Sequence, residues 1–225
     1  MVRTLSSKGA ILSNAPGVQP QLEFWFEFAS TYSYLSVMRI EELAAQAGVR
    51  VVWRPFLLGP IFRDFGWNTS PFLLQPEKGR YTWNDMRRRA ARYGLEFHMP
   101  SVFPRTALLP MRVALLGAEE PWIGPFCQRV MLQNFVDDLD ISQEDNTRRA
   151  LEGLVPDPDA CMRAAQAEDV KARLREQTGQ ARARGVFGAP TFFVGEEMFW
   201  GDDRLEDAIA FALKSAAADP AIRNG

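Results

Sequence analysis

Cysteine and histidine are almost absent from this chain, which has two cysteines and one histidine among 225 residues. Cys127 and Cys161 lie far apart and outside any metal-binding spacing, so we expect each to be a small, buried hydrophobic side chain. The single His98 excludes a multi-histidine metal site and argues against a Cys–His dyad, so we expect it to be structural or at the surface. The sequence therefore predicts no metal, and so few cysteines are typical of a reducing compartment.

An excess of charge of one sign and a long apolar run are also missing. The 26 basic and 28 acidic residues give a net charge of −2, which does not favour nucleic acid as a partner. A basic run at Arg87, Arg88, Arg89 and Arg92 falls on a predicted helix, where a solvated face is its expected role. No stretch approaches the ~20 apolar residues that cross a bilayer, so we expect no membrane partner and a cytoplasmic location. Residues 1–20 lack the apolar core of a signal peptide and are expected to be a disordered extension.

Residues 22–56 predict a strand, a helix and a second strand. Apolar residues at 22–28 alternate with other side chains, which is the period-two pattern of a strand. A helical stretch follows at 32–47 with Gly48 as its C-terminal cap, and residues 49–56 are β-branched and aromatic. This order is a βαβ unit.

The middle of the chain is predicted to be helical, and strands return near its end. Residues 190–194 and 198–200 are expected to form a hairpin. A last helix follows, with Asp203 as N-cap and Glu206 three residues later as in a capping box. The helices expected between the two strand regions cover 84–93, 111–118, 122–136, 143–154, 158–167 (with Asp157 as N-cap) and 168–184.

The order βαβ, helical block, ββα predicts an α/β, thioredoxin-like fold with a helical insertion. Residues 21–60 and 185–225 would form the thioredoxin-like domain. Residues 61–184 would form the inserted helical domain.

The tetrapeptide Ser30-Thr31-Tyr32-Ser33 lies where the first strand meets the helix. Thioredoxin-type enzymes carry Cys-x-x-Cys at that junction, because a helix N-terminus stabilises a thiolate. Both thiol positions are serines here, which indicates that the thiol arrives with a bound cofactor. The alternative is that Ser30 only caps the helix.

The segment Gly188-Ala189-Pro190-Thr191 is the second signal. A proline directly before a strand is a good place for a cis bond, which would turn the backbone of Ala189 toward a peptide-like ligand. An ordinary trans proline at the start of a strand is the alternative.

Several motifs carry a family resemblance over about residues 22 to 215. They are FEFASTYSYL (26–35), WRPFLLG (53–59), NTSP (68–71), PEKGRY (76–81), residues 185–194 and WGDDRL (200–205). Together they resemble the 2-hydroxychromene-2-carboxylate isomerases and their relatives, the kappa-class glutathione transferases. Both belong to the DsbA-like branch of the thioredoxin superfamily.

The resemblance implies glutathione as the cofactor. Ser30 matches the serine whose hydroxyl binds the glutathione sulfur and holds it as a thiolate. Ala189 and Pro190 match the backbone clamp on the cysteinyl unit. Ser33 is expected to be structural.

The same resemblance extends to the two ends of glutathione. Asp203, with Asp202 before it, matches the acidic site for the γ-glutamyl amine. Lys78 matches a basic residue that reaches a carboxylate or the substrate, and Asn68 matches a polar contact near the sulfur. The alternatives are a capping role for Asp203 and an irregular polar segment around Asn68 and Lys78.

The implied activity is glutathione-dependent isomerisation of 2-hydroxychromene-2-carboxylate or a related intermediate of aromatic catabolism. In the family reaction the thiolate adds to this small, unsaturated aromatic carboxylate. The adduct allows the ring to open and a former double bond to rotate, and elimination then regenerates glutathione. Relatives also suggest a homodimer. A kappa-like glutathione transferase or peroxidase, and a non-catalytic binding protein on this fold, are the alternatives. The serines argue against a disulfide oxidoreductase.

Two departures from the family pattern leave the substrate open. Thr31 stands where many relatives have proline, and residues 68–71 contain one proline where the isomerases commonly have two. Four aromatic residues could line a substrate pocket, with core or interface packing as the alternative: Trp67, Tyr81, Phe103 and Trp200.

Overall fold

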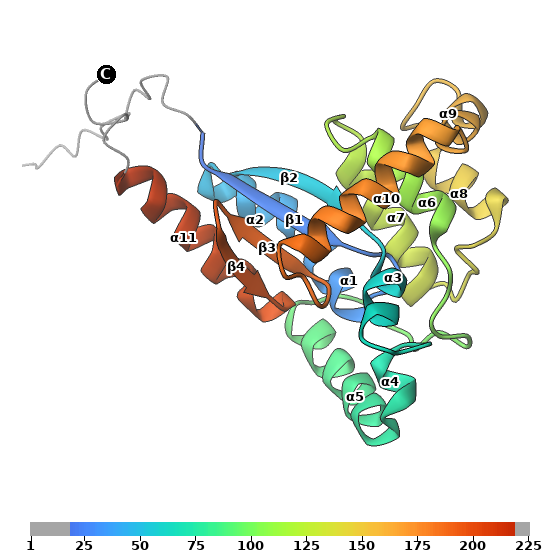
Figure 1. Cartoon of the computed structure of the whole chain (residues 1–225), viewed down its shortest axis with the longest axis horizontal. Helices are drawn as coiled ribbons and strands as arrows, with labels where there is room; N and C mark the ends of the chain where they lie inside the picture. The colour runs from blue at the N-terminus through green and yellow to red at the C-terminus, as the bar shows by residue number, and fades with distance from the viewer. Residues whose placement is uncertain (1–18, 219–225) are drawn as a thin grey trace, which may run out of the picture.

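The computed structural model describes residues 19–218 (Figure 1). Its four-stranded sheet has the order β2-β1-β3-β4, in which β1 and β2 are parallel and β3 is antiparallel to both of its neighbours. The strands are β1 (Gln21–Phe26), β2 (Arg50–Pro55), β3 (Thr191–Val194) and β4 (Glu197–Trp200). Each expected strand is confirmed, with ends that differ by at most two residues. The disordered extension expected over 1–20 lies outside the described residues, apart from Gln19 and Pro20.

Helices cover both faces of this sheet, and most of them lie between β2 and β3 in the sequence. In Figure 1, α10 crosses diagonally over the sheet and α4 and α5 extend below it. The helices are α1 (Thr31–Val37), α2 (Ile40–Ala47), α3 (Leu58–Asp64), α4 (Pro71–Leu74), α5 (Pro76–Arg92), α6 (Leu108–Leu116), α7 (Ile123–Phe135), α8 (Glu144–Leu151), α9 (Pro158–Ala165), α10 (Glu168–Ala183), the 3-10 turn η1 (Asp202–Arg204) and α11 (Leu205–Ala218).

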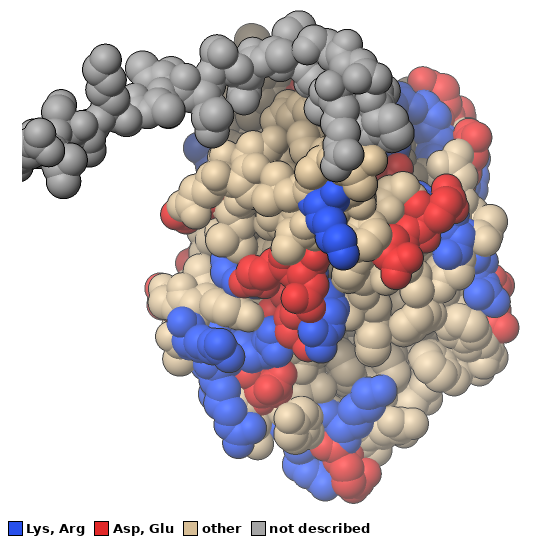
Figure 2. All heavy atoms as spheres, turned by 90° about the vertical axis from the view of Figure 1, so that its left-hand side faces the viewer, with Lys and Arg blue, Asp and Glu red and all other residues tan. Residues whose placement is uncertain are grey.

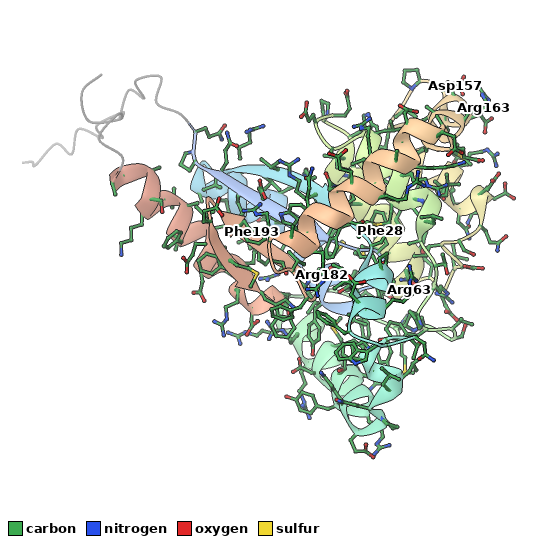
Figure 3. All side chains as sticks on the ribbon, in the orientation of Figure 1. Phe28, Arg63, Asp157, Arg163, Arg182 and Phe193 are labelled. Carbon is green, nitrogen blue, oxygen red and sulfur yellow. The ribbon has the colours of Figure 1, made fainter. Side chains whose placement is uncertain are left out.

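Successive residues of β1 are buried on opposite faces of the sheet. Phe24 and Phe26 belong to the larger hydrophobic core, together with residues of α1, α2, α6, α7 and α11. Trp25 belongs to a second cluster with Phe56 and Phe193, which α3 and α10 cover. Arg182, labelled in Figure 3, joins these two helices by donating to Asp64 Oδ2 at 3.3 Å. The junction after β1 therefore follows a strand that packs against helices on both faces.

The single helix expected over 32–47 is wrong, because the chain breaks between α1 and α2. Arg39 leaves the helical conformation with φ −121°, and its Nε donates to the carbonyl of Leu35 at 3.2 Å. The guanidinium thus satisfies a carbonyl that the interrupted helix leaves without its usual partner.

The helix expected at 84–93 begins earlier, at Pro76, and α3 and α4 were not expected. Prolines that look like breakers in the sequence lie in the first turns of these helices. Pro76 and Pro71 occupy the start of α5 and α4, and Pro60 lies in the first turn of α3. A proline is tolerated there because its missing N–H would have no intrahelical partner.

Two of the three expected caps are confirmed. Gly48 ends α2 with φ 68°, and Asp157 caps α9 by accepting from the backbone N–H of Ala160 at 2.9 Å. The N-cap expected at Asp203 is wrong, because Asp203 lies inside η1 and pairs with Arg204. Glu206 closes no capping box and accepts instead from Arg39 at 2.6 Å.

The larger core contains residues from the sheet and from the helices between β2 and β3 alike. The domain boundaries 21–60, 61–184 and 185–225 therefore stay a prediction. No helix within residues 19–218 is both long and apolar enough to cross a membrane. On the face shown in Figure 2, basic and acidic side chains lie next to one another.

Candidate functional site

Ser30 connects the two junctions that the sequence singled out. It is the N-cap of α1, and its Oγ accepts from the backbone N–H of Ser33 at 3.3 Å. The same hydroxyl donates to the carbonyl of Ala189 at 2.8 Å. The Ala189-Pro190 peptide bond is cis, as predicted. The serine junction and the proline loop thus share a hydrogen bond, although they lie far apart in the sequence.

The proline loop in turn holds the acidic turn. The carbonyl of Pro190 accepts from the backbone N–H of Gly201 at 3.0 Å. Gly201 has φ 108°, and a Cβ at this position would lie 2.6 Å from Oδ1 of Asp203. Glycine is required here for both reasons. Ser30, Ala189, Pro190 and the η1 turn therefore form one connected set.

The two neighbouring carboxylates of this turn have different surroundings. The Asp202 side chain is 2% exposed, and its Oδ2 accepts from Arg89 Nη2 at 2.9 Å and Nε at 3.1 Å. Burial raises the pKa of Asp202 to about 6, against the opposing effect of Arg89. The Asp203 side chain is 46% exposed, with one oxygen 3.2 Å from Arg204. Both carboxylates have an arginine partner, but only that of Asp203 is exposed to solvent.

The basic run on α5 is solvated only in part. Arg87, Arg88 and Arg92 are exposed, as expected. The expectation is wrong for Arg89, which turns inward to the buried Asp202. A buried carboxylate is costly unless it has such a partner.

Asn68 and Lys78 lie on the part of the chain around α4. Asn68 is exposed in the loop between α3 and α4, and Lys78 is exposed in the first turn of α5 rather than in an irregular segment. Among the described residues, neither side chain makes a hydrogen bond to the Ser30 junction. Their place in the site stays a prediction.

The hydroxyls of the serine tetrapeptide are not equivalent. Ser33 is fully buried, and its Oγ has no hydrogen-bond partner among the described residues. Ser30 retains 9% exposure and lies beside the cis proline loop. The structural interpretation of Ser33 agrees with its burial.

Sequence reasoning missed Glu27, which lies three residues before Ser30. Its carbonyl accepts from the backbone N–H of Ser30 at 3.1 Å. Burial raises the pKa of its carboxyl to about 7, against the opposing effect of the Leu58 N–H. In the sequence Glu27 looked like the polar member of an alternating strand, and only its closeness to Ser30 could have marked it.

The four aromatic residues proposed for a pocket or for packing are dispersed. Phe103 packs edge-on against Trp83, with ring centroids 4.8 Å apart. Trp67 packs with tilted rings against Phe62 and Phe65, and Tyr81 is exposed. Trp200 is 52% exposed and contacts Phe187, close to the proline loop.

Cys127 is buried and His98 lies at the surface, as expected, whereas Cys161 is only half-buried. Cys127 is buried, which raises the pKa of its thiol well above the usual value, and Cys161 is half-buried. Both are free thiols. His98 is exposed, and its Nδ1 lies 2.8 Å from the carbonyl of Val136. Within residues 19–218, no group of three or more metal-ligating side chains comes together.

Comparisons with known proteins show the family to which this chain belongs. The family model described as DSBA-like thioredoxin domain matches residues 21–211. The 2-hydroxychromene-2-carboxylate isomerase of Pseudomonas putida is 30% identical over 87% of this chain and 93% of its own length. Glutathione S-transferase kappa 1 of Rattus norvegicus is 26% identical over 82% of this chain and 87% of its own length.

A solved structure extends the similarity to three dimensions. A 2-hydroxychromene-2-carboxylate isomerase aligns with a TM-score of 0.75 and 27% identity, over 91% of this chain and 97% of that one. The thioredoxin-like α/β fold with many helices between its halves is therefore confirmed. The chain belongs to the DsbA-like thioredoxin family, within the group that holds the 2-hydroxychromene-2-carboxylate isomerases and the kappa-class glutathione transferases.

Proposed function

We propose that this protein is a glutathione-dependent isomerase that acts on 2-hydroxychromene-2-carboxylate or a related aromatic carboxylate. The observation that carries the proposal is the Ser30 hydroxyl, which caps α1 and lies 2.8 Å from the carbonyl of Ala189. A serine at this place, beside a cis proline loop, can bind the sulfur of another molecule. A cysteine there would itself supply the reactive thiol. The isomerases at 28–30% identity support the reaction class.

The residues present fit glutathione. The Ser30 hydroxyl has one proton, which it now donates to Ala189, and that proton can rotate toward a sulfur. The released carbonyl of Ala189 would then accept the N–H of the cysteinyl unit, so every polar group stays satisfied. The hydroxyl comes from the N-cap of α1, and the carbonyl lies two residues before β3.

Bound glutathione would supply a thiol that adds reversibly to a conjugated double bond. The role of Ser30 is to stabilise the thiolate form by donating its hydroxyl proton to the sulfur. The helix N-terminus contributes about 0.3–1 kcal/mol. Since α1 ends at Val37, this contribution comes from a short helix, and the hydrogen bond from Ser30 is the larger effect.

The remaining contacts follow from exposure and charge. We assign the γ-glutamyl amine to Asp203, because its carboxylate is half exposed. The buried Asp202 supports that site through its ion pair with Arg89. Asn68 and Lys78 would contact the ligand from the segment around α4 and α5. Ala189 and Pro190 would contact it from the proline loop. A homodimer and a cytoplasmic location, where glutathione is abundant, complete the proposal.

One titration tests the cofactor. Glutathione is added at neutral pH to the wild type, to Ser30→Ala and to Ser33→Ala, and the ultraviolet absorbance of the thiolate is followed. We expect a signal from the wild type and from the control Ser33→Ala, and none from Ser30→Ala. No signal from the wild type would contradict the use of glutathione. Equal signals from all three would remove Ser30 from the activating role.

A kappa-like transferase is the second candidate, supported by the kappa relatives. The two activities differ in their balance of glutathione. With 2-hydroxychromene-2-carboxylate as substrate, an isomerase forms product while the concentration of glutathione stays constant. A transferase consumes one glutathione for each electrophile it converts, which a free-thiol assay measures.

A further inference from the structure

Three polar residues, two on α5 and one at its C-cap, are spaced four positions apart and reach into the site region. They are Asp85, Arg89 and Tyr93, which we call the α5 stripe. Residues at this spacing lie one above another on a helix surface. Each member of the stripe contacts a residue outside α5, and together they reach α1, η1 and the break between α1 and α2.

The contacts of the stripe are close and partly buried. Asp85 Oδ2 accepts from the hydroxyl of Tyr32 at 2.8 Å. Arg89 donates twice to the buried carboxylate of Asp202, and its Nη2 also donates to the Tyr93 hydroxyl at 3.1 Å.

The last member of the stripe reaches the break between α1 and α2. The guanidinium of Arg39 lies 3.6 Å from the centre of the Tyr93 ring. The same guanidinium donates to the backbone carbonyl of Asp202 at 3.4 Å. Arg39 therefore joins the helix break to both the stripe and η1.

The partners of the stripe stand next to the two ends of the proposed glutathione site. Tyr32 lies two residues after Ser30, and Asp202 directly precedes Asp203. We propose that the α5 stripe is a positioning element, which fixes the separation between Ser30 and Asp203 and so sets the affinity for glutathione. The inference rests on the proposed function of this site.

Charge explains why the contact between Arg89 and Asp202 matters most among the contacts of the stripe. Asp202 faces Arg89 from α5, Arg39 from the helix break, Asp203 from its own turn, and the Tyr32 hydroxyl from α1. Farther out, Glu206 of α11 pairs with Arg39, and Asp85 holds Tyr32. Removing the Arg89 charge would leave a buried carboxylate with a weaker counter-charge, and the turn that carries Asp203 would shift to reach water.

The test compares glutathione affinity with turnover. Calorimetric titration with glutathione is made on the wild type, Arg89→Met, Asp202→Asn and the control Arg88→Met, a neighbouring exposed arginine. We expect Arg89→Met and Asp202→Asn to raise the dissociation constant about tenfold, which is ~1.4 kcal/mol. The rate of isomerisation by Arg89→Met at saturating glutathione should stay within about twofold of the wild-type rate, since this substitution leaves Ser30 in place. Arg89→Lys should recover part of the affinity.

A readout in pH separates positioning from simple loss of stability. Protonation of Asp202 near pH 6 weakens its pair with Arg89, so the affinity of the wild type should fall below that pH relative to Asp202→Asn. If Arg89→Met fails to fold, Tyr32→Phe carries the test, because it removes a single hydroxyl and should also weaken binding.

The outcomes are distinguishable. If Arg89→Met binds glutathione as tightly as Arg88→Met, the stripe has no positioning role while the proposed function stands. If the wild type binds no glutathione, the proposed function fails and this inference fails with it.

Discussion

The side-chain amide of Asn134, on α7, donates a 3.0 Å hydrogen bond to the carbonyl of Phe28, two residues before Ser30. The amide oxygen of Asn134 in turn accepts from Arg105 Nη1 at 3.1 Å. Arg105 also pairs with Asp138, whose pKa falls to about 2, chiefly because the Ser101 N–H and Arg105 donate to it. This chain of contacts fixes the loop that presents Ser30.

We expect Asn134→Ala to lower the free energy of unfolding by about 1–3 kcal/mol. The substitution leaves the buried carbonyl of Phe28 and one nitrogen of Arg105 without this partner. Urea unfolding followed by circular dichroism measures the loss. The control is the exposed Asn68→Ala, and equal stability of the two variants would contradict the prediction.

The two serines of the tetrapeptide should differ in stability as well as in function. Ser30→Ala removes an N-cap and a hydrogen bond to Ala189, and should cost about 0.5–2 kcal/mol. Ser33→Ala removes a buried hydroxyl without a partner among the described residues, and should be neutral or stabilising. Denaturant unfolding of both variants tests the contrast, and a larger loss for Ser33→Ala would refute it.

Glu27 should make the protein less stable as the pH rises. Its pKa is about 7 in the folded protein against 4.5 for the free group, so the folded state holds the proton more tightly. The resulting stability is fully present below about pH 4.5 and is lost as the pH rises through about 7. Glu27→Gln should therefore gain about 1–3 kcal/mol over the wild type at pH 8 relative to pH 5. Melting curves at both values measure the gain, and the exposed Glu119→Gln should show none.

Two glycine-to-alanine substitutions within helices should have opposite signs. A Cβ on Gly79 of α5 would lie 2.4 Å from the backbone carbonyl oxygen of Phe72, so α4 would have to move. We expect Gly79→Ala to cost about 1–3 kcal/mol. On α10, Gly179 has no atom within 4 Å of such a Cβ, and Gly179→Ala should gain about 0.5–1 kcal/mol. Thermal unfolding of both variants compares the signs. Stabilisation by both substitutions would show that α4 moves away from residue 79 without cost.

Local patterns were enough to predict the sheet. The alternation at 22–28 and the β-branched run at 49–56 located β1 and β2 to within two residues, because period-two alternation and β-branched residues are typical of strands. The junctions at Ser30 and Pro190 were also located by the sequence. Their direct hydrogen bond depends on the pairing of β1 with β3, which no local pattern encodes.

Helix ends were predicted less well because side chains distant in sequence decide them. The break at Arg39 depends on contacts of its guanidinium with Asp202 and Glu206, which are far along the chain. The first turn of α5 depends on Pro76, which reads equally as a breaker.

The roles of charged residues were the hardest to predict. Arg89 is one of four arginines in a short stretch, and only its partner distinguishes it from the others. The four-residue spacing of Asp85, Arg89 and Tyr93 is visible in the sequence, but periodicity alone does not say which face of a polar helix meets the protein.

The contacts of α5 have a consequence for protein engineering. A shortened thioredoxin that joins residue 60 directly to residue 185 would keep all four strands of the sheet. It would also leave Asp202 without Arg89, and the Tyr32 hydroxyl without Asp85. The helices between β2 and β3 therefore supply the counter-charge of Asp202 and the hydrogen-bond acceptor of Tyr32, and a minimal version of this protein has to redesign both positions.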